Sequence, residues 1–201
     1  VTDALAQSPN TTFVNLIKDV GVSPTVDMAV RLGMRSYDRK GTAADGDSIA
    51  GYIKKNNLGS FTLGPTAVNA LELSNVGATL ASGGVWCPPS PIESITARTG
   101  KPVDLNGPGC EQVVEPGLAN TLAVAMSKDA VGSGTAAGAA GAVGWGLPVS
   151  GKTGTTEANR SSAFLGFTNN YSAAVYAFND GTTTTELCTS PLRQCSYGNL
   201  F

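Results

Sequence analysis

The sequence predicts an α+β fold, in which helices come first along the chain and antiparallel strands come last. Apolar residues recur at helical spacing through much of the first two thirds of the chain. Three strand-like stretches follow, and a tight Asn169-Asn170 turn separates the last two. This order is typical of α+β domains, whereas a doubly wound sheet needs alternating strands and helices. With 201 residues the chain can bury a core, and we expect one domain or most of one.

Two short helices are expected first. One of about ten residues follows Ser8-Pro9-Asn10, which supplies cap residues, and ends at Gly21. The next has Pro24 at its first position and ends at Gly33. Residues 34–63 have weak periodicity and many turn formers, so we expect a surface excursion there.

The middle of the chain predicts two more helices and a hairpin. A longer helix is expected to open at Gly64-Pro65 and to stop at Gly83-Gly84. Residues 92–98 alternate like a strand and turn at Thr99-Gly100. Another helix starts at Pro116-Gly117, and a glycine-rich loop follows it. The three final strands are expected over Val149–Thr155, Ala163–Thr168 and Ser172–Phe178.

Composition excludes several classes of protein. The net charge is −2 and only 14% of residues are charged, so no nucleic-acid-binding surface is expected. No apolar run reaches the about 18–20 residues of a membrane span. Histidine is absent, which excludes a Ser-His-Asp triad, a Cys-His pair and histidine-ligated zinc within this chain. We expect no metal and no cofactor, and lysine is the obvious base left to activate a nucleophile.

The four cysteines fall in two local pairs, Cys87 with Cys110 and Cys188 with Cys195. Neither pair has the C-x-x-C spacing of zinc ribbons or redox motifs. Four cysteines allow three connectivities, and closeness along the chain favours the local one. Two such disulfides would indicate an oxidising, extracytoplasmic setting, while four free buried thiols remain the alternative.

The segment from Gly146 to Glu157 can be interpreted in two ways. Residues 146–153 fit the phosphate-loop spacing G-x-x-x-x-G-K-[ST], whereas Lys152 opens K-T-G-T, the strand motif of serine acyl-transferring enzymes that bind penicillin. A phosphate loop needs a buried strand before it and a helix starting at Lys152. Residues 131–144 are too glycine-rich for a core strand, and Gly154 follows where the helix should nucleate. The K-T-G-T interpretation is therefore favoured over a nucleotide-binding protein.

Four segments in a fixed order resemble the transpeptidase domain of class A (bifunctional) penicillin-binding proteins. Ser8-Pro9-Asn10 resembles the S-x-N segment, and residues 63–84 resemble the helix and glycine turn of the middle of the domain. Ser133-Gly134-Thr135 resembles the loop before the active-site strand, which is itself the K-T-G-T segment. The resemblance covers nearly the whole chain. It implies the fold shared by penicillin-binding proteins and serine β-lactamases, an antiparallel sheet packed with helices, incomplete in this chain.

The resemblance implies catalytic roles for Ser8 and Lys152. The Lys152 ammonium would lie beside the Ser8 hydroxyl, so that protons pass between them and the nucleophile without histidine. Asn10 offers both a donor and an acceptor and would grip an amide of the substrate peptide.

The same resemblance implies that the end of the strand binds substrate. Gly154 has no side chain, so a substrate backbone could lie against the strand. The N–H of Thr155 would help to form the oxyanion hole, and the hydroxyls of Thr153 and Thr155 would bind a terminal carboxylate. Strict alternation would not direct residues 152, 153 and 155 into one cleft, so local twist would have to supply that.

The chain departs from the family at the nucleophile. No serine is followed three residues later by lysine, and the nearest matches, Ser36 and Ser190, have arginine there. We therefore expect residues 1–201 to be a partial transpeptidase domain that lacks the upstream S-x-x-K segment. That serine would be on a companion fragment, and this chain alone would be inactive. No export signal is visible, so an extracytoplasmic, membrane-anchored protein would be anchored through a segment absent from this chain.

The resemblance implies partners and an activity. Peptidoglycan stem peptides would donate an acyl group from D-Ala-D-Ala to an amine through a serine acyl-enzyme, and β-lactam antibiotics would trap the same serine. A glycosyltransferase half would be in the missing part. The alternatives are a non-enzymatic binding or sensor module with the same pocket, a carboxypeptidase or β-lactamase of the same fold, and, least favoured, the phosphate-loop protein.

Overall fold

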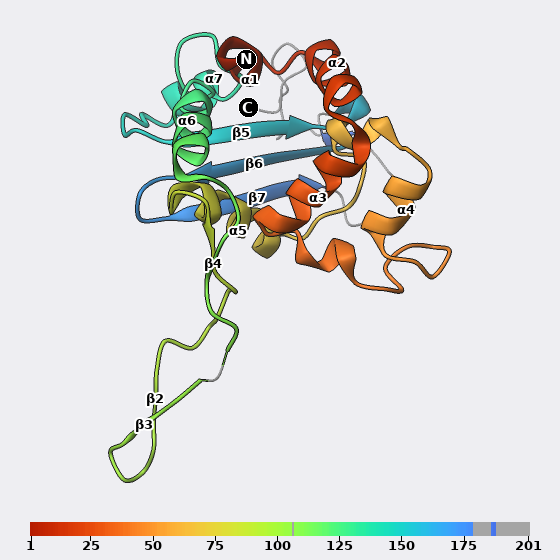
Figure 1. The fold of residues 1–201 in the computed structure, drawn as a ribbon. Coiled ribbons are helices and arrows are strands. Elements are labelled where there is room, and N and C mark those ends of the chain that lie inside the picture. Colours follow the sequence, from red (N-terminus) through yellow and green to blue (C-terminus); the bar gives the residue numbers. More distant parts are fainter. Residues whose placement is uncertain (106, 179–185, 188–201) are drawn as a thin grey trace.

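The computed structural model describes residues 1–105, 107–178 and 186–187, and it shows helices packed around a three-stranded antiparallel sheet (Figure 1). The α-helices are α1 Thr2–Gln7, α2 Asn10–Val20, α3 Val22–Leu32, α4 Ile49–Lys55, α5 Ala70–Ala81, α6 Pro116–Met126 and α7 Ala137–Ala142. Short 3-10 turns span η1 Arg35–Asp38, η2 Gly59–Leu63 and η3 Glu157–Asn159. The strands are β1 Val85–Trp86, β2 Ile95–Thr96, β3 Pro102–Val103, β4 Glu111–Gln112, β5 Ser150–Thr155, β6 Ser161–Phe167 and β7 Ser172–Phe178.

Helix boundaries follow from capping residues where the sequence supplies them. The Asn69 side chain accepts the Glu72 N–H at 2.8 Å and begins α5. Glu115 does the same for the Leu118 N–H at the start of α6, directly before Pro116. The expected start of α5 at Gly64-Pro65 is therefore wrong by several residues, because Asn69 is the cap.

The expectation of a surface excursion over residues 34–63 is also wrong. This stretch contains η1, α4 and η2, and its Tyr37, Ala50 and Ile53 side chains are buried. They form a core with Ile17 and Val26 of the first two long helices. The segments are too short to show a helical period, yet η1 and α4 bury one or two apolar side chains each, and the partly buried Phe61 of η2 packs against the same core.

A second core joins α5 and α6 to the sheet. It is built from Leu80, Val113, Ala119, Met126 and Phe167 among others. Helix α5 approaches the sheet so closely that a side chain at Gly77 would meet Leu165 at 3.0 Å and Phe167 at 3.2 Å. Helix α5 thus covers one face of β6 and β7, and β5 is held in position by its pairing with β6.

The strand order β5-β6-β7 makes β5 an edge of the sheet (Figure 1). Lys152 pairs with Leu165 of β6, and the β6–β7 hairpin turns through residues 168–171 as the Asn169-Asn170 pattern predicts. Since directly paired residues share a face, Lys152 lies on the face of Leu165, which is the α5 face.

A long arm extends from the body between β1 and β4, with the β2–β3 hairpin near its far end (Figure 1). Cys87 and Cys110 form a disulfide at its base, next to the β1–β4 pair. The Arg35 guanidinium lies 4.0 Å from the centre of the Trp86 ring and pairs with Glu111, which holds the base against the body. The second expected pair, Cys188 and Cys195, lies outside the described residues. No described helix is long and apolar enough to cross a membrane.

Candidate active site at the edge strand

The S-x-N segment lies at the junction of two helices. Ser8 and Pro9 separate α1 from α2, and Ser8 has a left-handed backbone, with φ 54° and ψ 42°. The N-terminus of α2 has no side-chain cap, so Ser8 and Asn10 do not fill the capping role that their types suggest. Neither side chain hydrogen-bonds to another described residue. The half-buried Ser8 hydroxyl and the exposed Asn10 amide are therefore available, within the described part of the chain, to meet a ligand.

Thr135 connects this segment to the K-T-G-T strand. Its backbone N–H donates to the Ala6 carbonyl at 3.0 Å, two residues before Ser8. Its hydroxyl hydrogen-bonds to the Thr153 hydroxyl of β5, next to Lys152. Gln7 Nε2 adds a weaker contact to the Ser133 hydroxyl at 3.4 Å. No direct hydrogen bond joins Ser8 to Lys152 in the described residues, so Thr135 is the link between the two motifs.

The Lys152 side chain is half-buried, and this burial affects the pKa of its ammonium group. Burial lowers the pKa of Lys152, because an ammonium loses hydration there, while the nearby Asp129 raises the pKa and partly opposes that effect. The Nζ atom donates to the Thr153 carbonyl at 3.1 Å and approaches the Thr153 hydroxyl at 3.4 Å. A lysine whose pKa is lowered exchanges protons more readily near neutral pH than an exposed lysine.

Asp129 is the site residue that the sequence patterns did not reveal. Its side chain is 1% exposed and follows α6, where one carboxylate oxygen accepts the Thr153 N–H at 3.1 Å. The other accepts the Thr135 hydroxyl at 2.5 Å. An acid between Lys128 and Ala130 looks like an ordinary surface charge, and no motif spacing connects it to the strand. Only the fold brings it behind β5.

The K-T-G-T residues differ in what they present. Thr153 is engaged by Thr135 and Asp129, so its hydroxyl contributes to the framework behind the strand. Gly154 and Thr155 are exposed at the end of β5, at the edge of the sheet. The two residues expected to bind a carboxylate therefore differ. Thr155 is exposed, whereas the Thr153 hydroxyl is already hydrogen-bonded to Thr135.

The strand also excludes the phosphate-loop alternative. Lys152 and Thr153 lie inside β5, whereas a phosphate loop requires them at the start of a helix. That interpretation is therefore wrong. No three acidic or cysteine side chains among the described residues gather into a group that would hold a metal ion.

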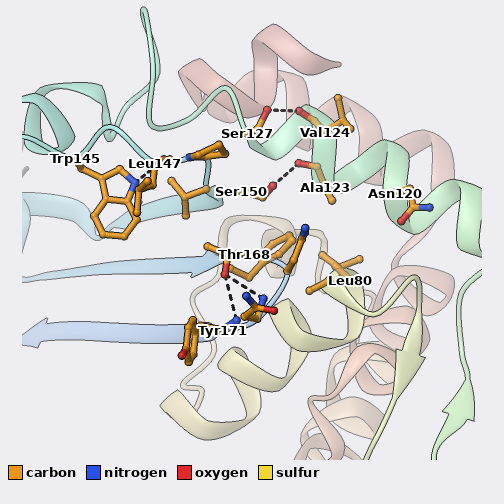
Figure 2. A pocket seen from close by; sticks show the side chains of 16 residues that line it. Leu80, Asn120, Ala123, Val124, Ser127, Trp145, Leu147, Ser150, Thr168 and Tyr171 are labelled. Atoms are coloured by element: carbon orange, nitrogen blue, oxygen red, sulfur yellow. Dashed lines mark hydrogen bonds between the residues drawn. The ribbon is translucent and has the colours of Figure 1, made fainter.

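A pocket of about 830 Å³ lies at the other end of β5 (Figure 2). Its walls include Leu80, Trp145 and Tyr171, together with Ser150 at the start of β5. The Ser150 hydroxyl donates to the Ala123 carbonyl at 2.7 Å and fastens the beginning of β5 to α6. Ser8, Asn10 and Lys152 do not line this pocket, so it is separate from the candidate catalytic groups.

The structure is thus an α+β domain in which a lysine-bearing edge strand is tied through Thr135 to a serine–asparagine segment between two helices. Residues 1–186 match the family described as penicillin binding protein transpeptidase domain, and the chain belongs to that family. This confirms the family and the fold that the sequence motifs indicated.

One relative agrees with the family, and several solved structures share the fold. Penicillin-binding protein 1A of Aquifex aeolicus is 30% identical over 164 residues, which is 82% of this chain and 20% of the relative. The solved structure of penicillin-binding protein PonA1 from Mycobacterium tuberculosis has a TM-score of 0.73 at 22% identity, and its complex with penicillin V has the same TM-score at 23% identity. Each likeness covers 98% of this chain and 52% of the solved chain. Penicillin-binding protein 1A from Haemophilus influenzae has a TM-score of 0.65 at 19% identity, over 89% of this chain and 30% of that one. The chain therefore spans about half of PonA1 and a fifth of the Aquifex relative.

Proposed function

We propose that this chain is the S-x-N and K-T-G bearing part of a peptidoglycan D,D-transpeptidase. Membership of the transpeptidase-domain family supports this, and so does the join between the two motifs through Thr135. The observation that carries the proposal is the half-buried Lys152, whose ammonium is partly stripped of water at the rim of the sheet. Such a group suits proton transfer to and from a serine hydroxyl in a protein without histidine.

The nucleophile is supplied from outside this chain. None of its serines belongs to an S-x-x-K motif, and the chain covers about half of the PonA1 structure that it resembles. We call the combination of this chain with the polypeptide that carries the S-x-x-K serine the assembled transpeptidase. This chain alone is inactive.

Each step then has a group assigned to it. The serine oxygen attacks the carbonyl of the D-Ala-D-Ala amide, and the departing D-Ala nitrogen takes a proton by way of Ser8 and Lys152. An amine of a second stem peptide attacks the ester, forms the new amide and returns the serine hydroxyl. The exposed edge at Gly154 accepts the substrate backbone as an added strand, and Asn10 binds a peptide amide. A β-lactam enters the same site and leaves the serine acylated.

The test is acyl transfer by the assembled transpeptidase. A stem peptide ending in D-Ala-D-Ala and an amine acceptor should give free D-Ala and a cross-linked product in equal amounts. Asn10→Ala should lower kcat/KM up to about 10-fold, because one or two hydrogen bonds to the substrate are lost. Asn15→Ala is the matched control, since Asn15 is exposed on the same helix.

Two other results would replace the proposal with a rival. Release of D-Ala without any acceptor product would indicate a carboxypeptidase of the same fold. Binding of penicillin without a covalent bond or turnover would indicate a sensor module.

A further inference from the structure

An unbroken series of hydrogen bonds runs from the catalytic lysine into the protein. Lys152 Nζ approaches the Thr153 hydroxyl at 3.4 Å, and the Thr153 hydroxyl contacts the Thr135 hydroxyl. The Thr135 hydroxyl meets Asp129 Oδ1 at 2.5 Å. Three segments contribute to it: β5, the loop before α7 and the turn that follows α6.

The chemistry of the two ends fixes the direction of every bond. An ammonium only donates and a carboxylate only accepts. Thr135 has a single hydroxyl proton, which it donates to Asp129, so Thr153 must be the donor to Thr135. Thr153 in turn accepts from Lys152. All the hydroxyl dipoles therefore point from the positive end to the negative end, an arrangement in which neighbouring bonds reinforce one another.

Among the charged side chains on the segments around Lys152, Asp129 is the buried one and acts as its charged partner. Asp129 is 1% exposed, and it is the charge that acts on the Lys152 ammonium. The other charged side chains on adjoining segments are exposed to solvent: Asp3, Lys128, Glu157 and Arg160. Helix α6 and strand β6 contribute no charged side chain. A buried charge interacts more strongly than one screened by water.

We propose that Asp129 is a positioning residue for the acyl-transfer reaction, which holds Lys152 in place and keeps it protonated through the hydroxyls of Thr153 and Thr135. The proposal rests on the proposed function, because it assigns a role at the same site. Asp129 touches no reacting atom. It acts on the lysine and, through the Thr153 N–H, on the course of β5.

The sign of the pH effect follows from the two influences on Lys152. Burial lowers the pKa of Lys152 and Asp129 raises it, so the negative charge extends the protonated form to higher pH. If the reaction uses the protonated lysine, activity falls as pH rises through that pKa. Removing the charge lowers the pKa further, and the alkaline fall in activity then begins at lower pH.

The experiment measures the rate of covalent acylation by fluorescent penicillin against pH, in the assembled transpeptidase. Asp129→Asn keeps the size of the side chain and removes its charge, and it leaves one acceptor oxygen for the Thr135 hydroxyl or the Thr153 N–H. We expect its alkaline fall to move to lower pH, with several-fold slower acylation on the alkaline side and a nearly unchanged rate below it. Asp19→Asn, which removes a charge from an exposed site on α2, should leave the profile as in the wild type.

Different failures have different meanings. A profile of Asp129→Asn that is lowered equally at every pH, or not changed at all, overturns the inference. If Asp129→Asn does not fold, Thr135→Val provides the test in its place. It should move the alkaline fall in activity to lower pH, whereas Thr135→Ser, which keeps the hydroxyl, should have the wild-type profile. A Thr135→Val protein with the wild-type profile overturns the inference as well. A wild-type protein that is never acylated contradicts the proposed function instead.

Discussion

Replacing Lys152 by alanine should reduce penicillin acylation of the assembled transpeptidase by about 10²–10⁴-fold, the usual contribution of a positioned acid–base group. The protein offers no histidine to replace it, and the charge that acts on its ammonium is that of the buried acid Asp129. Lys152→Arg should acylate with penicillin as slowly as Lys152→Ala. A guanidinium stays protonated throughout and is wider than the ammonium that fits beside Thr153.

Lys18→Ala is the matched control, since Lys18 is exposed near the end of α2. It should label at the wild-type rate. Thermal unfolding of Lys152→Ala should occur at a somewhat lower temperature than in the wild type, because the buried Asp129 loses its positively charged partner. Wild-type labelling by a folded Lys152→Ala protein would remove lysine from the mechanism.

Gly134→Ala should damage both stability and acylation. A Cβ atom at Gly134 would overlap the backbone carbonyl oxygens of Lys128 and Asp129, which cannot swing away as a side-chain tip can. The loop would have to move, and with it Thr135, which holds β5 to the S-x-N segment. We expect the free energy of unfolding to fall by about 1–3 kcal/mol, the usual cost of forcing extra volume into a packed region.

Gly138→Ala, in the same glycine-rich segment, tests whether the effect is specific. It lies in α7, and a Cβ there meets nothing within 4 Å. Alanine favours a helix over glycine by about 0.5–1 kcal/mol, so this variant should unfold at the same temperature or slightly higher. Denaturant unfolding followed by circular dichroism measures both. Equal stability of Gly134→Ala and wild type would show that the loop is looser than its contacts indicate.

Most of the fold could be predicted because its signals are local. Pro116 begins α6, Gly33 follows α3, and Asn169-Asn170 turns the hairpin. The region around Tyr37 could not, because its burial depends on α2 and α3 packing over segments too short to show a period. The start of α5 is not evident from the sequence, because Gly64-Pro65 resembles a helix start and Asn69, which caps the helix, stands several residues later.

The site divides in the same way. Ser8, Asn10 and Lys152 belong to short motifs whose order along the chain is visible without a structure. Asp129 belongs to none, and its role depends on the turn that brings the end of α6 behind β5. The different environments of Thr153 and Thr155 likewise depend on which side of an edge strand meets the loop. Tertiary contacts decide such details, and periodicity along the chain does not contain them.

The most direct measurement is intact mass after incubation with penicillin V, made on this chain alone and on the assembled transpeptidase. The account predicts no covalent gain on this chain by itself. In the assembled form it predicts one penicillin per site, attached to the polypeptide that carries the S-x-x-K serine. A covalent adduct on this chain alone, or none in the folded assembled form, would contradict the account.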